Sequence, residues 1–189
     1  NSTLIAPDGK DVSEDLAYFI NVFGLDAVMS GRYSMLLGLQ LYIGFKAKIL
    51  NPWKVIDEIK SLEGMQPSRL KPSTPFKGKY LKGLYHKHYL EYGLRAVAKN
   101  LRKNLRKDIT HWFQKHNQDF SVEDVPSFVR DFVYGRWENL IRRQKLTGEW
   151  IIYAEHEGKN YYLCLGKHGD DDKNIRKQID ALCCLEFPF

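Results

Sequence analysis

The sequence predicts an α+β fold that is mostly α: a helical domain with a C-terminal antiparallel β-hairpin followed by a short terminal helix. Three observations support this class. Apolar residues recur at helical spacing through most of the first 146 residues. Two later runs, 150–155 and 160–165, are rich in Ile, Tyr and Trp and flank Gly158, which is typical of a hairpin. The length of 189 residues, 43% of them hydrophobic, favours a single domain over 1–189.

We expect helices in the first segment, residues 1–64. Ser13 is placed to cap a first helix, and Gly24 is placed to end it. The most apolar run, 33–45, is 13 residues long. A membrane span needs about 20 apolar residues, so we interpret this run as part of a buried helix and predict no membrane span.

A proline-rich loop separates these helices from a basic segment. Asn51 and Pro52 are typical of a helix start, with an N-cap followed by proline at the first helical position. Residues 65–76 contain three prolines together with Ser and Thr, so a loop is expected there. A basic helix region follows over 77–116, with a long helix running from about His86.

The remaining segments complete the predicted domain. Apolar spacing predicts a helix over 121–146, and the hairpin and terminal helix occupy 149–189, the helix covering roughly 173–185. The chain has three cysteines, two of them adjacent, which is a poor disulfide framework and favours reduced thiols in the cytoplasm. The acids at 170–172 are interpreted as a helix cap rather than a metal site, and no cofactor is predicted.

The positive charge of the chain comes from one segment. Residues 77–107 carry ten Lys and Arg against one acid, Glu91, which is a net charge of +9. The other 158 residues hold 19 bases and 22 acids, a net charge of −3. Four tyrosines are interleaved with the cations. A concentrated cationic and aromatic surface is typical of nucleic-acid binding.

On a helical projection this segment separates into two faces. Apolar residues from Leu94 to Trp112 form one stripe that would anchor the helix to a core. The cations lie on the other side, and no acid occurs between Arg95 and Lys107, whereas a solvated face usually mixes both signs. The predicted nucleic-acid-binding residues are Lys82, Lys87, Arg95, Lys99, Arg102, Lys103, Arg106 and Lys107.

Histidines supply the chemistry that a metal-independent ribonuclease of toxin type requires. Such an enzyme needs a general base, a general acid and cations that hold the phosphate. Histidines of the basic segment would be completed by a hairpin histidine, either His156 or His168, which lie at opposite ends of one strand. The candidate catalytic residues are His86, His88, Tyr92, His156 and His168.

Two hypotheses about function follow from these residues. The first is a protein that binds RNA or DNA through the basic, Tyr- and His-containing helix face, with ribonuclease activity as its enzymatic form. The second is a non-catalytic interaction protein whose basic helix docks an acidic protein partner. Nucleic acid or an acidic protein would relieve the repulsion between like charges spaced four residues apart along the helix.

Overall fold

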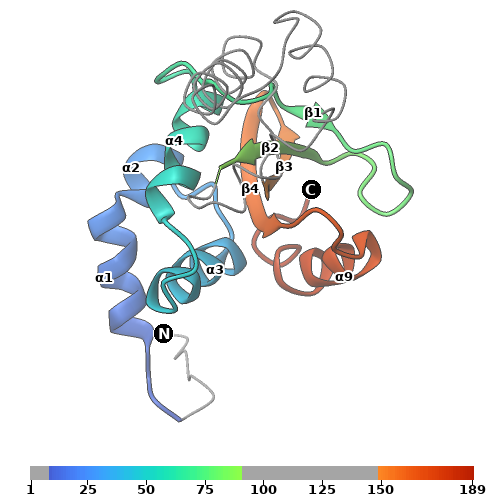
Figure 1. The fold of residues 1–189 in the computed structure, drawn as a ribbon. Coiled ribbons are helices and arrows are strands. Elements are labelled where there is room, and N and C mark those ends of the chain that lie inside the picture. Colours follow the sequence, from blue (N-terminus) through green and yellow to red (C-terminus); the bar gives the residue numbers. More distant parts are fainter. Residues whose placement is uncertain (1–8, 91–148) are drawn as a thin grey trace, which may run out of the picture.

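A computed structural model describes residues 9–90 and 149–189, and these residues form an α+β fold (Figure 1). Within these ranges there are five helices and a four-stranded antiparallel sheet with the order β1-β2-β3-β4. The helices are α1 (Ser13–Phe23), α2 (Leu25–Met29), α3 (Met35–Lys46), α4 (Pro52–Leu62) and α9 (Asp172–Leu182). The strands are β1 (Thr74–Pro75), β2 (Tyr85–Tyr89), β3 (Glu149–His156) and β4 (Lys159–Gly166).

Local signals place the N-terminal helices. Gly24 ends α1 in the left-handed conformation, with φ of 65°, and the Asn51 side chain accepts a hydrogen bond from the Trp53 backbone N–H at the start of α4. Both signals were predicted. Ser13 differs from the prediction: it is the first residue of α1, and its backbone N–H donates to Asp11 Oδ1 at 2.9 Å. Val12 is the N-cap residue and provides no side-chain cap, and the Asp11 carboxylate accepts from the first N–H of the helix.

The sheet corrects the prediction of a helix from His86. Residues 85–89 form β2, which pairs antiparallel with β3 so that His88 lies opposite Trp150 and Tyr85 opposite Tyr153. The short β1 pairs with the other edge of β2, within the expected proline-rich loop. The predicted hairpin is thus one half of a four-stranded sheet among the described residues.

The two faces of the sheet carry separate hydrophobic cores. Figure 1 shows the four N-terminal helices on one side of the strands and α9 on the other. The first core contains side chains of α1 to α4 together with Tyr89, Ile151 and Tyr162 of the sheet. The second contains Ile152 and Cys164 with apolar residues of α9. Alternation along β3 thus divides its side chains between two layers of helices, whereas a register shift in β4 turns both Leu163 and Cys164 to the second core.

The C-terminal prediction is confirmed with small shifts in its bounds. Glu157 and Gly158 join β3 to β4 with φ of 49° and 72°, the backbone that a two-residue hairpin turn requires. The terminal helix begins at Asp172, capped by the Asp171 side chain, and ends at Leu182.

Three further findings concern the remaining predictions. Within the described ranges, none of the helices is long and apolar enough to cross a membrane. The three cysteines are free thiols. The predicted helix over 121–146, and the part of the basic helix region from residue 91 onward, lie outside the described residues.

Candidate functional site

Three of the predicted catalytic histidines come together on the α9 side of the sheet. The rings of His88 and His168 are stacked, with centroids 5.4 Å apart and an angle of 17° between their planes. The His86 ring lies 5.3 Å from that of His88, and the Trp150 ring lies 4.6 Å from that of His168. We call these four residues the histidine cluster. Its members come from β2, β3 and the segment that follows β4.

Strand register explains why residues so distant in the sequence meet. His86 and His88 lie on the same face of β2 because they are two residues apart. Trp150 pairs with His88 on one side and with Gly166 on the other, so the segment after Gly166 passes beside the cluster. A Cβ atom at Gly166 would lie 3.0 Å from Ile152 Cδ1 and 3.5 Å from Trp150 Cε3. Glycine at this position therefore leaves room for the Ile152 side chain against the strand.

The three imidazoles differ in their access to solvent. His168 is exposed, His86 is half-buried and His88 has only 2% of its surface exposed. The Glu149 carboxylate is fixed to the segment after β4, because its Oε2 accepts a hydrogen bond from the His168 backbone N–H at 2.9 Å. A substrate would therefore meet His168 first, with the other two rings behind it.

His86 is held in its neutral form by its surroundings. Burial lowers the pKa of the His86 imidazole, and the positive charges of Lys71 and His168 lower it further. A hydrogen bond with the Thr74 backbone raises the pKa by less than these effects lower it. The Thr74 side chain is also near, with Oγ1 3.3 Å from His86 Nε2. Among the described residues, His86 Nδ1 has no hydrogen-bond partner. The imidazole of His86 is therefore harder to protonate than an ordinary histidine side chain.

Lys87 does not lie where a phosphate-binding residue is expected. Its position on β2 turns the side chain to the opposite face from the histidines, where only 3% of the residue is exposed. The ammonium lies 3.2 Å from Glu58 Oε2 and donates to Ser68 Oγ and to the Lys71 carbonyl oxygen, both at 2.9 Å. Burial and these three partners remove Lys87 from the predicted nucleic-acid surface.

The other predicted site residues lie away from the histidine cluster or outside the described residues. His156 lies apart from the cluster, with its ring stacked on that of Phe189 at 4.1 Å. Lys82 is exposed in the turn before β2. The residues outside the described ranges are Tyr92, Arg95, Lys99, Arg102, Lys103, Arg106 and Lys107.

Sequence reasoning missed Glu149, Trp150 and Lys71. The signal that was present is local: Trp150 and Gly166 are the outer pair of the hairpin, so a residue just after Gly166 must lie near residue 149. The pairing of β2 with β3 had no local signal, since about 60 residues separate the two strands.

Comparison of this chain with models of protein families, with curated proteins and with solved structures finds no match. The geometry of the cluster therefore carries the functional argument. Imidazole rings exchange protons near neutral pH, and the Glu149 carboxylate is hydrogen-bonded to the backbone of the residue that carries the exposed imidazole. This arrangement is suited to moving protons on and off a substrate at the surface of the sheet. Within the described ranges no three His, Cys, Asp or Glu side chains are placed to share a metal ion.

Proposed function

We propose that this protein binds nucleic acid and cleaves RNA without a metal ion at the histidine cluster. One observation carries the proposal: His88 and His168, eighty positions apart in the chain, stack at 5.4 Å, and the Glu149 carboxylate accepts a hydrogen bond from the His168 backbone N–H. Histidines are costly to gather, because like charges repel if more than one ring is protonated. A cluster of this kind, next to the most basic segment of the chain, is suited to chemistry on a phosphodiester.

Glu149 and His168 are the groups that we assign to proton transfer. The Glu149 carboxylate takes the proton of a ribose 2′-hydroxyl as that oxygen attacks the adjacent phosphorus. The protonated His168 gives its proton to the 5′-oxygen as the P–O bond to it breaks. The products are a 2′,3′-cyclic phosphate and a free 5′-hydroxyl. Proton transfer by positioned groups of this kind contributes about 10²- to 10⁴-fold in rate.

His88 and His86 act through His168 rather than on the substrate. The His88 ring lies under the His168 ring and is almost fully buried, so it sets the orientation of the exposed imidazole. His86 lies behind His88, and its lowered pKa keeps it uncharged near neutral pH. A neutral ring there avoids a further positive charge beside His168.

Nucleic-acid binding is assigned to the cations of the basic segment. The residues that we assign to it are exposed Lys82 and the cations from Arg95 to Lys107. Their net charge would attract the phosphates of RNA or DNA and release counterions. We place this activity in the cytoplasm, where the three free thiols would stay reduced.

Cleavage of RNA in the presence of EDTA tests the proposal. A labelled single-stranded RNA is incubated with the full chain, and the fragments are resolved on a gel. We expect cleavage by the unaltered protein, and a rate at least about 100-fold lower for His168→Ala and for Glu149→Gln. The matched control is His156→Ala, which removes an imidazole from the last residue of β3, at the turn of the hairpin, and should leave the rate unchanged.

Two results would contradict this assignment. RNA that stays intact in every lane would end the ribonuclease proposal. Cleavage that is slowed equally by His156→Ala and His168→Ala would show that the histidine cluster has no special part in it.

A further inference from the structure

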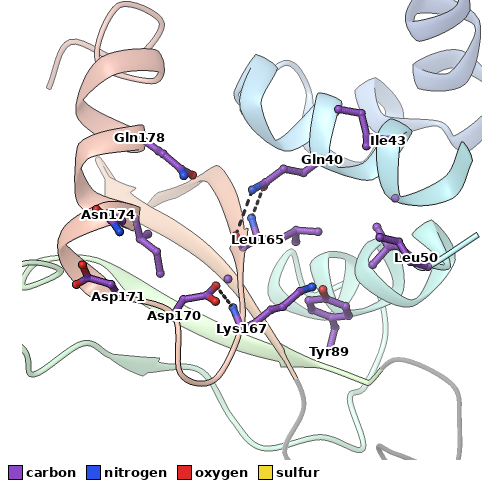
Figure 2. Close-up of a pocket in the computed structure, with 14 residues that line it drawn as sticks. Gln40, Ile43, Leu50, Tyr89, Leu165, Lys167, Asp170, Asp171, Asn174 and Gln178 are labelled. Atoms are coloured by element: carbon purple, nitrogen blue, oxygen red, sulfur yellow. Dashed lines mark hydrogen bonds between the residues drawn. The ribbon is translucent and has the colours of Figure 1, made fainter. Parts of the chain in front are cut away.

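A cleft of about 540 Å³ lies between α3 and α9, over the end of β4 (Figure 2). Its apolar lining comes from Leu50, Leu165 and Ile175. Its volume falls within the range of pockets that take a small molecule, about 300–1,000 Å³. Such a cleft has room for a flat ring and the sugar that is joined to it.

Amide side chains face each other across this cleft. Figure 2 shows Gln40 of α3 and Gln178 of α9 pointing toward one another. The Gln40 amide is fixed by Leu165, because Gln40 Oε1 accepts from the Leu165 N–H at 2.6 Å and Gln40 Nε2 donates to the Leu165 carbonyl oxygen at 3.4 Å. Asn174 lies one helical turn before Gln178, so both amides line the same wall.

The charges at one end of the cleft are nearly balanced. Lys167 and Asp170 both line it, and the Asp170 carboxylate is fixed by a hydrogen bond from the Lys167 backbone N–H at 2.7 Å. Asp171 adds a second carboxylate at the start of α9. One cation beside two carboxylates disfavours a phosphate group inside the cleft. An uncharged ligand with hydrogen-bonding edges and apolar faces suits this lining better.

A nucleobase has these properties. Asn, Gln, Lys and carboxylate side chains are the groups that proteins use to read base edges. Guanine offers O6 and N7 to a lysine such as Lys167, and its N1–H and N2–H groups to a carboxylate such as Asp170. A purine also covers more of an apolar floor than a pyrimidine does.

The cleft and the histidine cluster are joined by consecutive residues. Lys167 lines the cleft, and His168, the next residue, belongs to the cluster. We infer that the cleft binds an unpaired purine base of an RNA strand whose phosphate lies at His168. This inference rests on the proposed ribonuclease, and it adds a base preference that the histidine cluster alone would not give.

Titration of the full chain with mononucleotides tests the inference. We expect 5′-GMP to bind with a Kd about tenfold lower than that of 5′-CMP, measured by calorimetry or by NMR shifts. The double variant Asn174→Ala, Gln178→Ala should raise the Kd for 5′-GMP about tenfold. Both positions are exposed on a helix surface, so the substitutions should not affect folding. The matched control is Asn21→Ala, an exposed amide on α1.

The results separate this inference from the proposed function. Equal Kd values for 5′-GMP and 5′-CMP, or equal effects of the α9 double variant and Asn21→Ala, would overturn base recognition by the cleft. If RNA were still cleaved in a His168-dependent way, the proposed function would stand without the inference. Binding of 5′-GMP that depends on Gln178, with RNA left intact, would support base recognition and overturn the ribonuclease.

Discussion

The side chain of Lys87 shows how one residue of a basic segment can serve the fold. Its ammonium is buried against the Glu58 carboxylate at 3.2 Å, and the two side chains are 4% and 13% exposed. Ser68 and the Lys71 carbonyl oxygen take its other hydrogens. Because both charges are removed from water, each depends on the other for compensation. The pair therefore joins α4 to β2 and also holds part of the proline-rich loop.

We predict that Lys87→Met lowers the free energy of unfolding by about 3 kcal/mol, because it leaves the Glu58 carboxylate in a poorly hydrated place without its cation. The double variant Glu58→Gln, Lys87→Met should recover most of this loss, since no uncompensated charge remains. Urea unfolding measures both. Lys82→Met is the control, because an exposed lysine should change stability by no more than about 0.5 kcal/mol. Equal urea midpoints for Lys82→Met and Lys87→Met would contradict this account.

The difference between Lys82 and Lys87 could not be predicted from the sequence. Both were expected to bind nucleic acid because composition and charge treat every lysine in the segment alike. Burial of Lys87 depends on Glu58, which lies 29 positions earlier and is brought near by the packing of α4 on β2. By contrast, Asn51 and Gly24 act on backbone atoms within three residues, so their roles were predicted correctly.

At the scale of the element, α3 contains two glycines with opposite surroundings. A Cβ atom on Gly44 would lie 2.7 Å from Leu50 Cβ, so this glycine allows the chain after α3 to fold back onto the helix. The Leu50 backbone N–H donates to the Gly44 carbonyl oxygen at 3.1 Å across this close approach. A Cβ atom on Gly38 would have no neighbour within 4 Å. Packing therefore requires glycine at Gly44 and not at Gly38.

We predict that Gly44→Ala destabilises the protein by about 1–3 kcal/mol, because the new methyl group overlaps Leu50. Gly38→Ala should stabilise it by about 0.5–1 kcal/mol, because alanine loses less conformational entropy in a helix and meets no atom there. The two variants add the same methyl group to the same helix, so each is the control for the other. Urea or thermal unfolding that shifts in the same direction for both would contradict the prediction.

Helices and strands with local signals were predicted from the sequence. Strand β2, which depends on pairing with a distant part of the chain, was not. The hairpin of β3 and β4 and the helices α1, α3, α4 and α9 were expected within a few residues of their bounds. Residues 85–89, with alternating aromatic and basic side chains, fit a strand as well as the start of a helix. Their hydrogen bonds to β3 decide the outcome, and no local pattern contains that register.

Across the whole molecule, the sheet connects the two cores to the candidate site. The same strand that buries Lys87 and Tyr89 toward the N-terminal helices turns His86 and His88 toward the α9 side. The three histidines that meet were all among the candidates named from the sequence, whereas Glu149 and Trp150 were not. The choice of His168 over His156 could not be predicted, because it depends on β2 pairing with residues 149–153 of β3, the end of the hairpin at which His168 lies.

The distribution of charge over the chain predicts how the affinity for RNA depends on salt concentration. The segment 77–107 carries +9, whereas the rest carries −3, so phosphates should be bound by few and closely spaced cations. The logarithm of the affinity for single-stranded RNA should fall linearly with the logarithm of the salt concentration, by about 0.7 for each phosphate contact. Arg102→Gln with Arg106→Gln should flatten this slope by about 1.4.

Lys159→Gln with Lys177→Gln removes the same charge elsewhere and should leave the slope unchanged. Equal slopes for the two double variants would remove the basic segment from the binding surface, and no RNA binding at low salt would favour an acidic protein as its partner.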